Sequence, residues 1–180
     1  MKERFLNIGG YSIYVADSER GEQSVVLLHG YLESLRVWDD FVGLLTDKVR
    51  VVAIDIPGHG RSSNIAPVHT MELMAEVVKG VLDELQIDSA TLVGHSMGGY
   101  VAQNCIKLFP EVFEGIILLN STPFADSPEK KVDRNREIEL ILTAKLGHLA
   151  AISIPKMYAP SNLRRLDEKI EETIEITETH

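Results

Sequence analysis

Short apolar runs and amphipathic stretches alternate along the first two thirds of the chain. The apolar runs are typical of strands buried on both faces, and we expect them at residues 24–28, 49–56, 90–93 and 115–120. Between them apolar residues recur at helical spacing, at about residues 37–45, 70–86 and 97–109. Two shorter strands precede this series and are joined by Gly9 and Gly10, which suit a hairpin turn. The pattern predicts an α/β fold with a mostly parallel central sheet flanked by helices on both sides.

The character of the chain changes after Asn120. Residues 126–137 are polar and charged, and residues 137–149 have a helical pattern. Residues 162–178 form an acidic stretch whose apolar residues lie on one stripe of a helix. We therefore predict an α/β part up to about Asn120 and a mainly helical part after it.

The composition is that of a soluble globular protein. Of the 180 residues, 44% are hydrophobic, which is enough to bury a core. The net charge of −9 has the wrong sign for holding a polyanion, so we expect no nucleic-acid partner. No stretch resembles a signal peptide or approaches the ~18 apolar residues of a membrane span. The single cysteine, Cys105, cannot form an intramolecular disulfide, and we expect a cytoplasmic protein that binds no membrane.

The most specific motif is Gly-His-Ser-Met-Gly at residues 94–98, followed by Gly99. It lies where a predicted strand meets a predicted helix, which is the context that a nucleophile turn requires. Glycines on both sides of Ser96 remove side chains that would collide with the neighbouring strand and helix. We predict that Ser96 is a catalytic nucleophile. The amide of Met97, at the helix N-terminus, is the natural first donor to an oxyanion.

Two further motifs follow predicted strands. His29 and Gly30 come directly after residues 24–28, and the amide of Tyr31 is the candidate for a second oxyanion donor. Asp-Ile-Pro-Gly-His-Gly-Arg-Ser-Ser, at residues 55–63, follows the next strand. Its proline and glycines demand a tight path, and we expect Asp55 to anchor this loop.

With these three motifs in order, the chain resembles the α/β-hydrolase fold family over about residues 1–123. The resemblance implies a serine hydrolase that works through an acyl-enzyme, with Ser96 as nucleophile and the amides of Tyr31 and Met97 as oxyanion hole. It implies a small-molecule substrate, a carboxylic ester or related acyl compound. It also implies that the segment from about Phe124 is a helical cap that lines the substrate pocket.

The sequence departs from the family at the acid and histidine of the catalytic triad. The family places both after strands that follow the cap, and we find no such strands in residues 1–180. Asp126 and His148 are the candidates within the chain, although His148 is more simply a cap or pocket-lining residue. His180 is terminal and is expected to be frayed. His29 and His59 are better explained by loop packing and hydrogen bonding than by proton transfer. His95 must leave the turn in a different direction from Ser96, so we expect it to be structural. We expect His29, Gly30 and His95 to lie in the loops at the pocket.

Alternatives to a complete hydrolase stay open. No metal or cofactor motif is present, and we expect neither group. The chain could be a non-catalytic binding or assembly protein, or a fragment that needs a complementing chain. The strand at residues 115–120 would then be an unpaired sheet edge that invites a homo-oligomer or a complementing fragment. We favour the hydrolase, since a strained nucleophile turn gains nothing in a pure binding module.

Overall fold

The computed structural model describes residues 1–143 and 145–179. The chain divides into two compact units, Met1–Pro123 and Phe124–His180. The first holds a sheet with its helices, and the described part of the second is helical. Within the described ranges, no helix is both long and apolar enough to cross a membrane.

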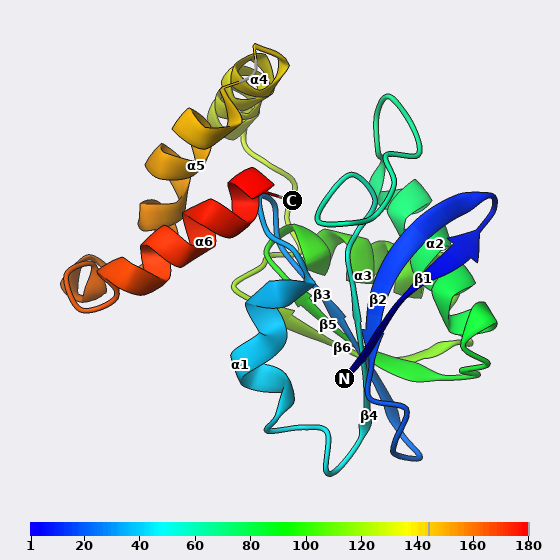
Figure 1. The fold of residues 1–180 in the computed structure, drawn as a ribbon. Helices are drawn as coiled ribbons and strands as arrows, with labels where there is room; N and C mark the ends of the chain where they lie inside the picture. The colour runs from blue at the N-terminus through cyan, green and yellow to red at the C-terminus, as the bar shows by residue number, and fades with distance from the viewer. Residues whose placement is uncertain (144, 180) are drawn as a thin grey trace. The chain divides into compact units, whose positions relative to one another are not determined.

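A six-stranded sheet forms the centre of the first unit (Figure 1). Its strands in chain order are β1 (Lys2–Ile8), β2 (Tyr11–Asp17), β3 (Ser24–Leu28), β4 (Arg50–Ile54), β5 (Ala90–His95) and β6 (Phe113–Leu119). They lie side by side in the order β1-β2-β4-β3-β5-β6. The first two strands form an antiparallel hairpin, β2 is antiparallel to β4, and the other pairs are parallel. The predicted mostly parallel sheet is confirmed, so the loops after β3, β4 and β5 all leave from the same edge of the sheet.

Helices cover both faces of this sheet (Figure 1). On one face α2 (Met71–Glu84) and α3 (Met97–Leu108) pack over a core that includes Val26 and Leu28 of β3. On the other face Leu27 packs with Leu35 and Trp38 of the short 3-10 helix η1 (Leu35–Trp38). Successive side chains of a strand point to opposite faces, so a strand between two covered faces is apolar at every position.

The prediction of one helix at about residues 37–45 is wrong. The structure has η1 followed by a single turn of α-helix, α1 (Asp39–Val42). The amide of Leu44 then donates to the carbonyl of Phe41 (3.1 Å), and the amide of Leu45 to that of Val42 (3.0 Å). These bonds span three residues instead of four, so the chain tightens into turns and the α-helix does not continue.

The second unit contains three α-helices in its described part. They are α4 (Pro128–Leu142), α5 (Leu146–Ser153) and α6 (Asp167–Thr179), with the 3-10 turns η2 (Ile154–Met157) and η3 (Pro160–Asn162) between α5 and α6. Residues 124–143 and 145–179 contain no strand.

The helix boundaries predicted for this unit are wrong. Helix α4 begins within the charged residues 126–137, because Ser127 Oγ accepts from the amide of Lys130 (3.3 Å) and Pro128 suits the first turn. It ends at Leu142, inside residues 137–149 where the pattern predicts one helix. Helix α6 begins at Asp167 because Asn162 belongs to η3, which closes a separate turn before it.

Candidate active site

Ser96 lies at the sharp turn between β5 and α3. Its φ of 47° and ψ of −112° fall in a region that residues other than glycine rarely adopt. The amide of Ser96 donates to the carbonyl of Leu119 at 3.1 Å. The carbonyl of Ser96 accepts from Ser121 Oγ at 2.8 Å and from the amide of Gly99 at 3.1 Å. The end of β6 and the residues after it therefore hold the strained turn in place.

The glycines around Ser96 are required by close packing, against backbone at Gly94 and Gly98 and against a side chain at Gly99. A Cβ at Gly94 would lie 2.5 Å from the carbonyl oxygen of Gly98. A Cβ at Gly98 would overlap the carbonyl of Leu28, and one at Gly99 would overlap the side chain of Ser121. Each glycine thus permits β3, β5, α3 or the segment after β6 to approach the turn.

The first turn of α3 follows Ser96 directly. Met97 is the first residue of α3, so its amide belongs to the helix N-terminus, where amide groups have no partner within the helix. The positive end of the helix dipole strengthens these donors. The assignment of the Met97 amide to an oxyanion hole stays a prediction.

His29 joins two loops at the same sheet edge. Its Nδ1 lies 2.8 Å from the carbonyl of Gly30, and its Nε2 accepts from the amide of Ile56 at 3.0 Å. Burial lowers the pKa of His29 to about 3, so the ring is neutral with its hydrogen on Nδ1. Both ring nitrogens are engaged, and the geometry gives His29 a structural role between β3 and β4.

Asp55 anchors the loop after β4. Its side chain is buried, with Oδ1 accepting from the amide of Leu35 (2.7 Å) and Oδ2 from the amide of Arg61 (2.8 Å). Gly60, with φ of 55°, lies against this carboxylate. The aspartate of the second motif therefore fixes the start of η1 as well as its own loop.

Tyr31 lies between Gly30 and Leu32 in the loop after β3. Its ring meets that of His59 edge-on, with centroids 6.3 Å apart. Leu32 has a φ of 63°, so the chain is strained immediately after Tyr31. The amide of Tyr31 as second oxyanion donor stays a prediction.

Glu33 is a site residue that the sequence analysis missed. Its Oε2 accepts from the amide of Gly30 (2.6 Å) and lies 2.8 Å from Nδ1 of His95, and its side chain is only 7% exposed. His95 also meets the indole of Trp38 edge-on, at 6.4 Å between centroids. His95 thus points from the Ser96 turn to the loop after β3. An acidic residue three positions after Gly30 is the only signal in the sequence for this contact.

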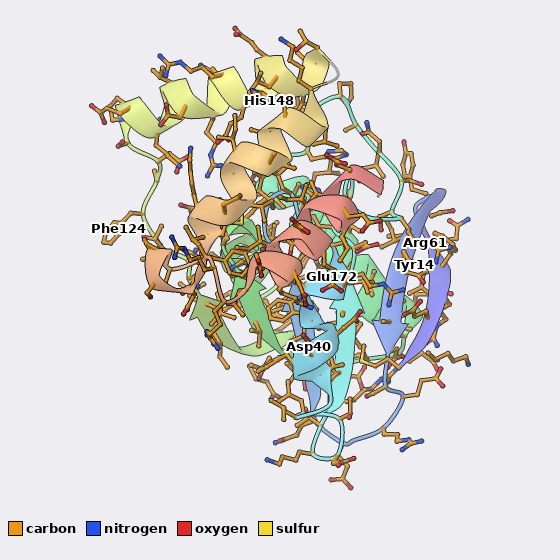
Figure 2. All side chains as sticks on the ribbon, turned by 60° about the vertical axis from the view of Figure 1, so that its left-hand side comes forward. Tyr14, Asp40, Arg61, Phe124, His148 and Glu172 are labelled. Atoms are coloured by element: carbon orange, nitrogen blue, oxygen red, sulfur yellow. The ribbon has the colours of Figure 1, made fainter. Side chains whose placement is uncertain are left out.

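The two triad candidates belong to the second unit. The carboxylate of Asp126 pairs with Arg134, with 3.2 Å between Oδ2 and Nε. His148 lies on α5 and is exposed (Figure 2). His180 lies outside the described residues. Within the described part of the chain, no three His, Cys, Asp or Glu side chains are grouped to hold a metal ion.

Comparison with known families agrees with this geometry. Residues 23–139 match the model of a family described as the alpha/beta hydrolase fold. The chain belongs to this family. In this α/β-hydrolase fold chain, the matched range includes the Ser96 turn and the loops after β3 and β4.

Individual relatives are longer than this α/β-hydrolase fold chain. It is 33% identical over 123 residues to "Uncharacterized hydrolase YugF" of Bacillus subtilis, covering 67% of this chain and 45% of that protein. A thermophilic esterase from Thermogutta terrifontis superposes with a TM-score of 0.90 and 28% identity, over 99% of this chain and 67% of the esterase. A hydrolase from Pseudomonas aeruginosa PA01 gives a TM-score of 0.88 at 26% identity, over 99% and 67%. The chain therefore spans less than half of the curated relative and two thirds of these solved structures.

Proposed function

We propose that this chain carries the nucleophile of a serine hydrolase that acts on carboxylic esters or related acyl compounds. The observation that carries the proposal is the φ of 47° at Ser96, held between β5 and the N-terminus of α3. Such strain persists only where the surrounding structure maintains it, and it is concentrated at functional sites. The similarity to an esterase at 28% identity supports this substrate class.

The reaction would proceed through an acyl-enzyme at Ser96. The serine Oγ loses its proton to a general base and forms a bond to the carbonyl carbon, while the carbonyl oxygen takes the negative charge. The amides of Met97 and Tyr31 bind this oxyanion, and the α3 dipole stabilises it. Collapse of the tetrahedral intermediate breaks the bond to the leaving oxygen, which takes the proton from the protonated base and departs as the alcohol. A water molecule then hydrolyses the ester at Ser96 and releases the acid.

The base is a separate part of the proposal. The ring nitrogens of His29 are both engaged, and Nδ1 of His95 is paired with Glu33, so we assign neither residue as the base. We infer that a histidine takes the proton from Ser96, either His148 or one from the part of the family fold that this chain does not span. Asp126 is the candidate acid within the chain. We propose that residues 124–180 form the cap.

Active-site labelling tests the proposal. The purified chain is treated with a fluorophosphonate, followed by intact mass, and assayed with p-nitrophenyl acetate. We expect one label per chain, lost in Ser96→Ala and retained in Ser89→Ala, whose hydroxyl lies before β5 and bonds Glu114. Labelling that persists in Ser96→Ala would contradict the proposal. A folded wild-type chain that takes no label would exclude His148 as the base and leave the histidine to the part of the family fold that this chain does not span.

A second candidate function is assembly through the edge of the sheet. Strand β6 is at the end of the strand order, beside β5 alone, and Ile117 and Leu119 on it are 54% and 43% exposed. An apolar unpaired edge is a template for a strand of another chain. We propose a second copy of this chain as the occupant, with a complementing fragment as the other outcome.

Light scattering after size exclusion tests the edge. Assembly through β6 predicts that Ile117→Lys shifts the chain to a monomer, whereas Val68→Lys, on a loop and 74% exposed, does not. A monomeric wild-type chain would exclude self-assembly and leave complementation by a separate polypeptide to be tested by co-expression.

A further inference from the structure

One carboxylate oxygen links the loop after β3 to the residue that directly precedes Ser96. Glu33 Oε2 accepts from the amide of Gly30 at 2.6 Å, in the loop after β3. The same oxygen lies 2.8 Å from Nδ1 of His95, the residue directly before Ser96. The two partners are far apart in the sequence, and the parallel pairing of β3 with β5 brings their loops together.

The contact determines which ring nitrogen of His95 carries a hydrogen. An ionised carboxylate only accepts hydrogen bonds, so Nδ1 of His95 must carry the hydrogen. The Glu33 side chain is 7% exposed and that of His95 is 20% exposed, so water replaces neither partner easily. Loss of the carboxylate would leave the Gly30 amide and the His95 Nδ1–H without this acceptor.

The short loop that Glu33 closes contains Tyr31. Residues 30 to 33 are closed by the bond from Glu33 to the Gly30 amide, and Leu32 within them is strained at φ of 63°. A Cβ at Gly30 would lie 2.8 Å from Glu33 Oε2 and 3.1 Å from His95 Nδ1. Glycine at position 30 is therefore the residue that lets the carboxylate and the imidazole meet beside the loop backbone.

We propose that Glu33 is a positioning residue that holds the Tyr31 amide in register with the Ser96 turn. This inference rests on the proposed function, because the amide matters to catalysis only if it binds the oxyanion. The Glu33 carboxylate contacts the Gly30 amide and the His95 ring. It acts through the Gly30 amide on one side and through the His95 ring on the other. These two contacts of Glu33 set the distance between the amides of Tyr31 and Met97, the two donors of the proposed oxyanion hole.

Two substitutions separate this role from general stability. Both hydrogen bonds end on a single oxygen, so the amide oxygen of Glu33→Gln can accept both, whereas Glu33→Ala removes them. Misplacing or losing an oxyanion donor lowers the rate by ~100-fold. We expect fluorophosphonate labelling and kcat to fall about that much in Glu33→Ala, with KM little changed, and to recover to within ~10-fold of the wild-type values in Glu33→Gln.

A buried carboxylate elsewhere provides the matched control. Asp17 is buried and bonded to Arg4 and Arg50, and Arg50 begins β4, away from the carboxyl ends of the strands. Asp17→Ala should destabilise the chain without slowing the labelling of the folded protein. Equal labelling rates in Glu33→Ala and the wild type, or an equal loss in Asp17→Ala, would overturn the proposal.

An NMR measurement decides the inference if the wild-type chain takes no label, because it does not depend on an activated Ser96. The ¹⁵N spectrum of the His95 ring should show the hydrogen on Nδ1. The amide resonance of Tyr31 should shift in Glu33→Ala and return towards its wild-type position in Glu33→Gln. A His95 ring with its hydrogen only on Nε2, or a Tyr31 amide unmoved in Glu33→Ala, would overturn the positioning role.

Discussion

Arg61 lies over the ring of Tyr14 and also donates a hydrogen bond to its hydroxyl (Figure 2). The guanidinium carbon is 4.2 Å from the ring centroid, and Nη1 is 2.7 Å from the hydroxyl oxygen. Tyr14 belongs to β2, and Arg61 to the loop after β4 that Asp55 anchors. The contact therefore ties the second motif loop to the N-terminal hairpin.

Replacement of Arg61 should destabilise this loop. We expect Arg61→Ala to lower the free energy of unfolding by ~1 kcal/mol, since it removes a cation–π contact and a hydrogen bond. Arg61→Lys should recover only part of this, because an ammonium does not reproduce the planar guanidinium. Urea unfolding measures the effect, with Arg20→Ala in an exposed loop as control. An equal loss in the control would show that the Tyr14 contact contributes nothing specific.

Acidification should destabilise the chain through His29. Burial lowers the pKa of His29 from 6.5 to about 3, so the unfolded chain binds this proton at a higher pH than the folded chain. The contribution is present above pH 6.5 and is lost as the pH falls towards 3, with a slope of up to ~1.4 kcal/mol per pH unit. Burial also lowers the pKa of His59 and of His69, which add in the same direction.

The pH slope of stability isolates the His29 effect. Urea unfolding at several pH values between 4 and 7 should give a smaller slope in His29→Gln, even if that variant is less stable at every pH. His148→Gln, on the exposed surface of α5, should keep the wild-type slope. An unchanged slope in His29→Gln would mean that His29 is not held neutral by burial.

A methyl group at Gly98 should disrupt the turn at Ser96. The added Cβ would overlap the carbonyl of Leu28, which is rigid backbone, and we expect a loss of ~1–3 kcal/mol in unfolding free energy. Gly43→Ala is the matched control, because its φ is −59° and a Cβ there meets no atom within 4 Å. That variant should be neutral or stabilising by up to ~1 kcal/mol. Thermal unfolding compares the two, and similar melting temperatures would refute the packing argument.

Cys105 should be unreactive in the folded chain. Its side chain is buried on α3, and burial raises the pKa of the thiol to about 12. Because the thiolate is the reactive form, modification by Ellman's reagent at pH 8 should be at least ~100-fold slower than in urea. Rapid reaction of the native chain would indicate that α3 opens locally.

The sequence by itself determined most of the local elements and the turn at Ser96. Parallel strands buried on both faces leave an apolar run, so β3 is predicted with both of its ends correct. The turn at Ser96 is predicted because Gly94 and Gly98 are demanded by contacts with neighbouring backbone, which any similar strand–turn–helix would make. Where periodicity was ambiguous, as around α1 and α4, tight turns and side-chain caps decided the boundaries.

Only the tertiary structure decided which loops meet. Periodicity reports the faces of single elements, and it contains no information on which strand lies beside which. The position of β3 between β4 and β5 brings Glu33 to His95 across 62 positions of the chain, and His29 to Ile56 across 27. A hydrogen bond between side chain and distant backbone leaves no local pattern, since many residue types can occupy either position until the sheet has formed.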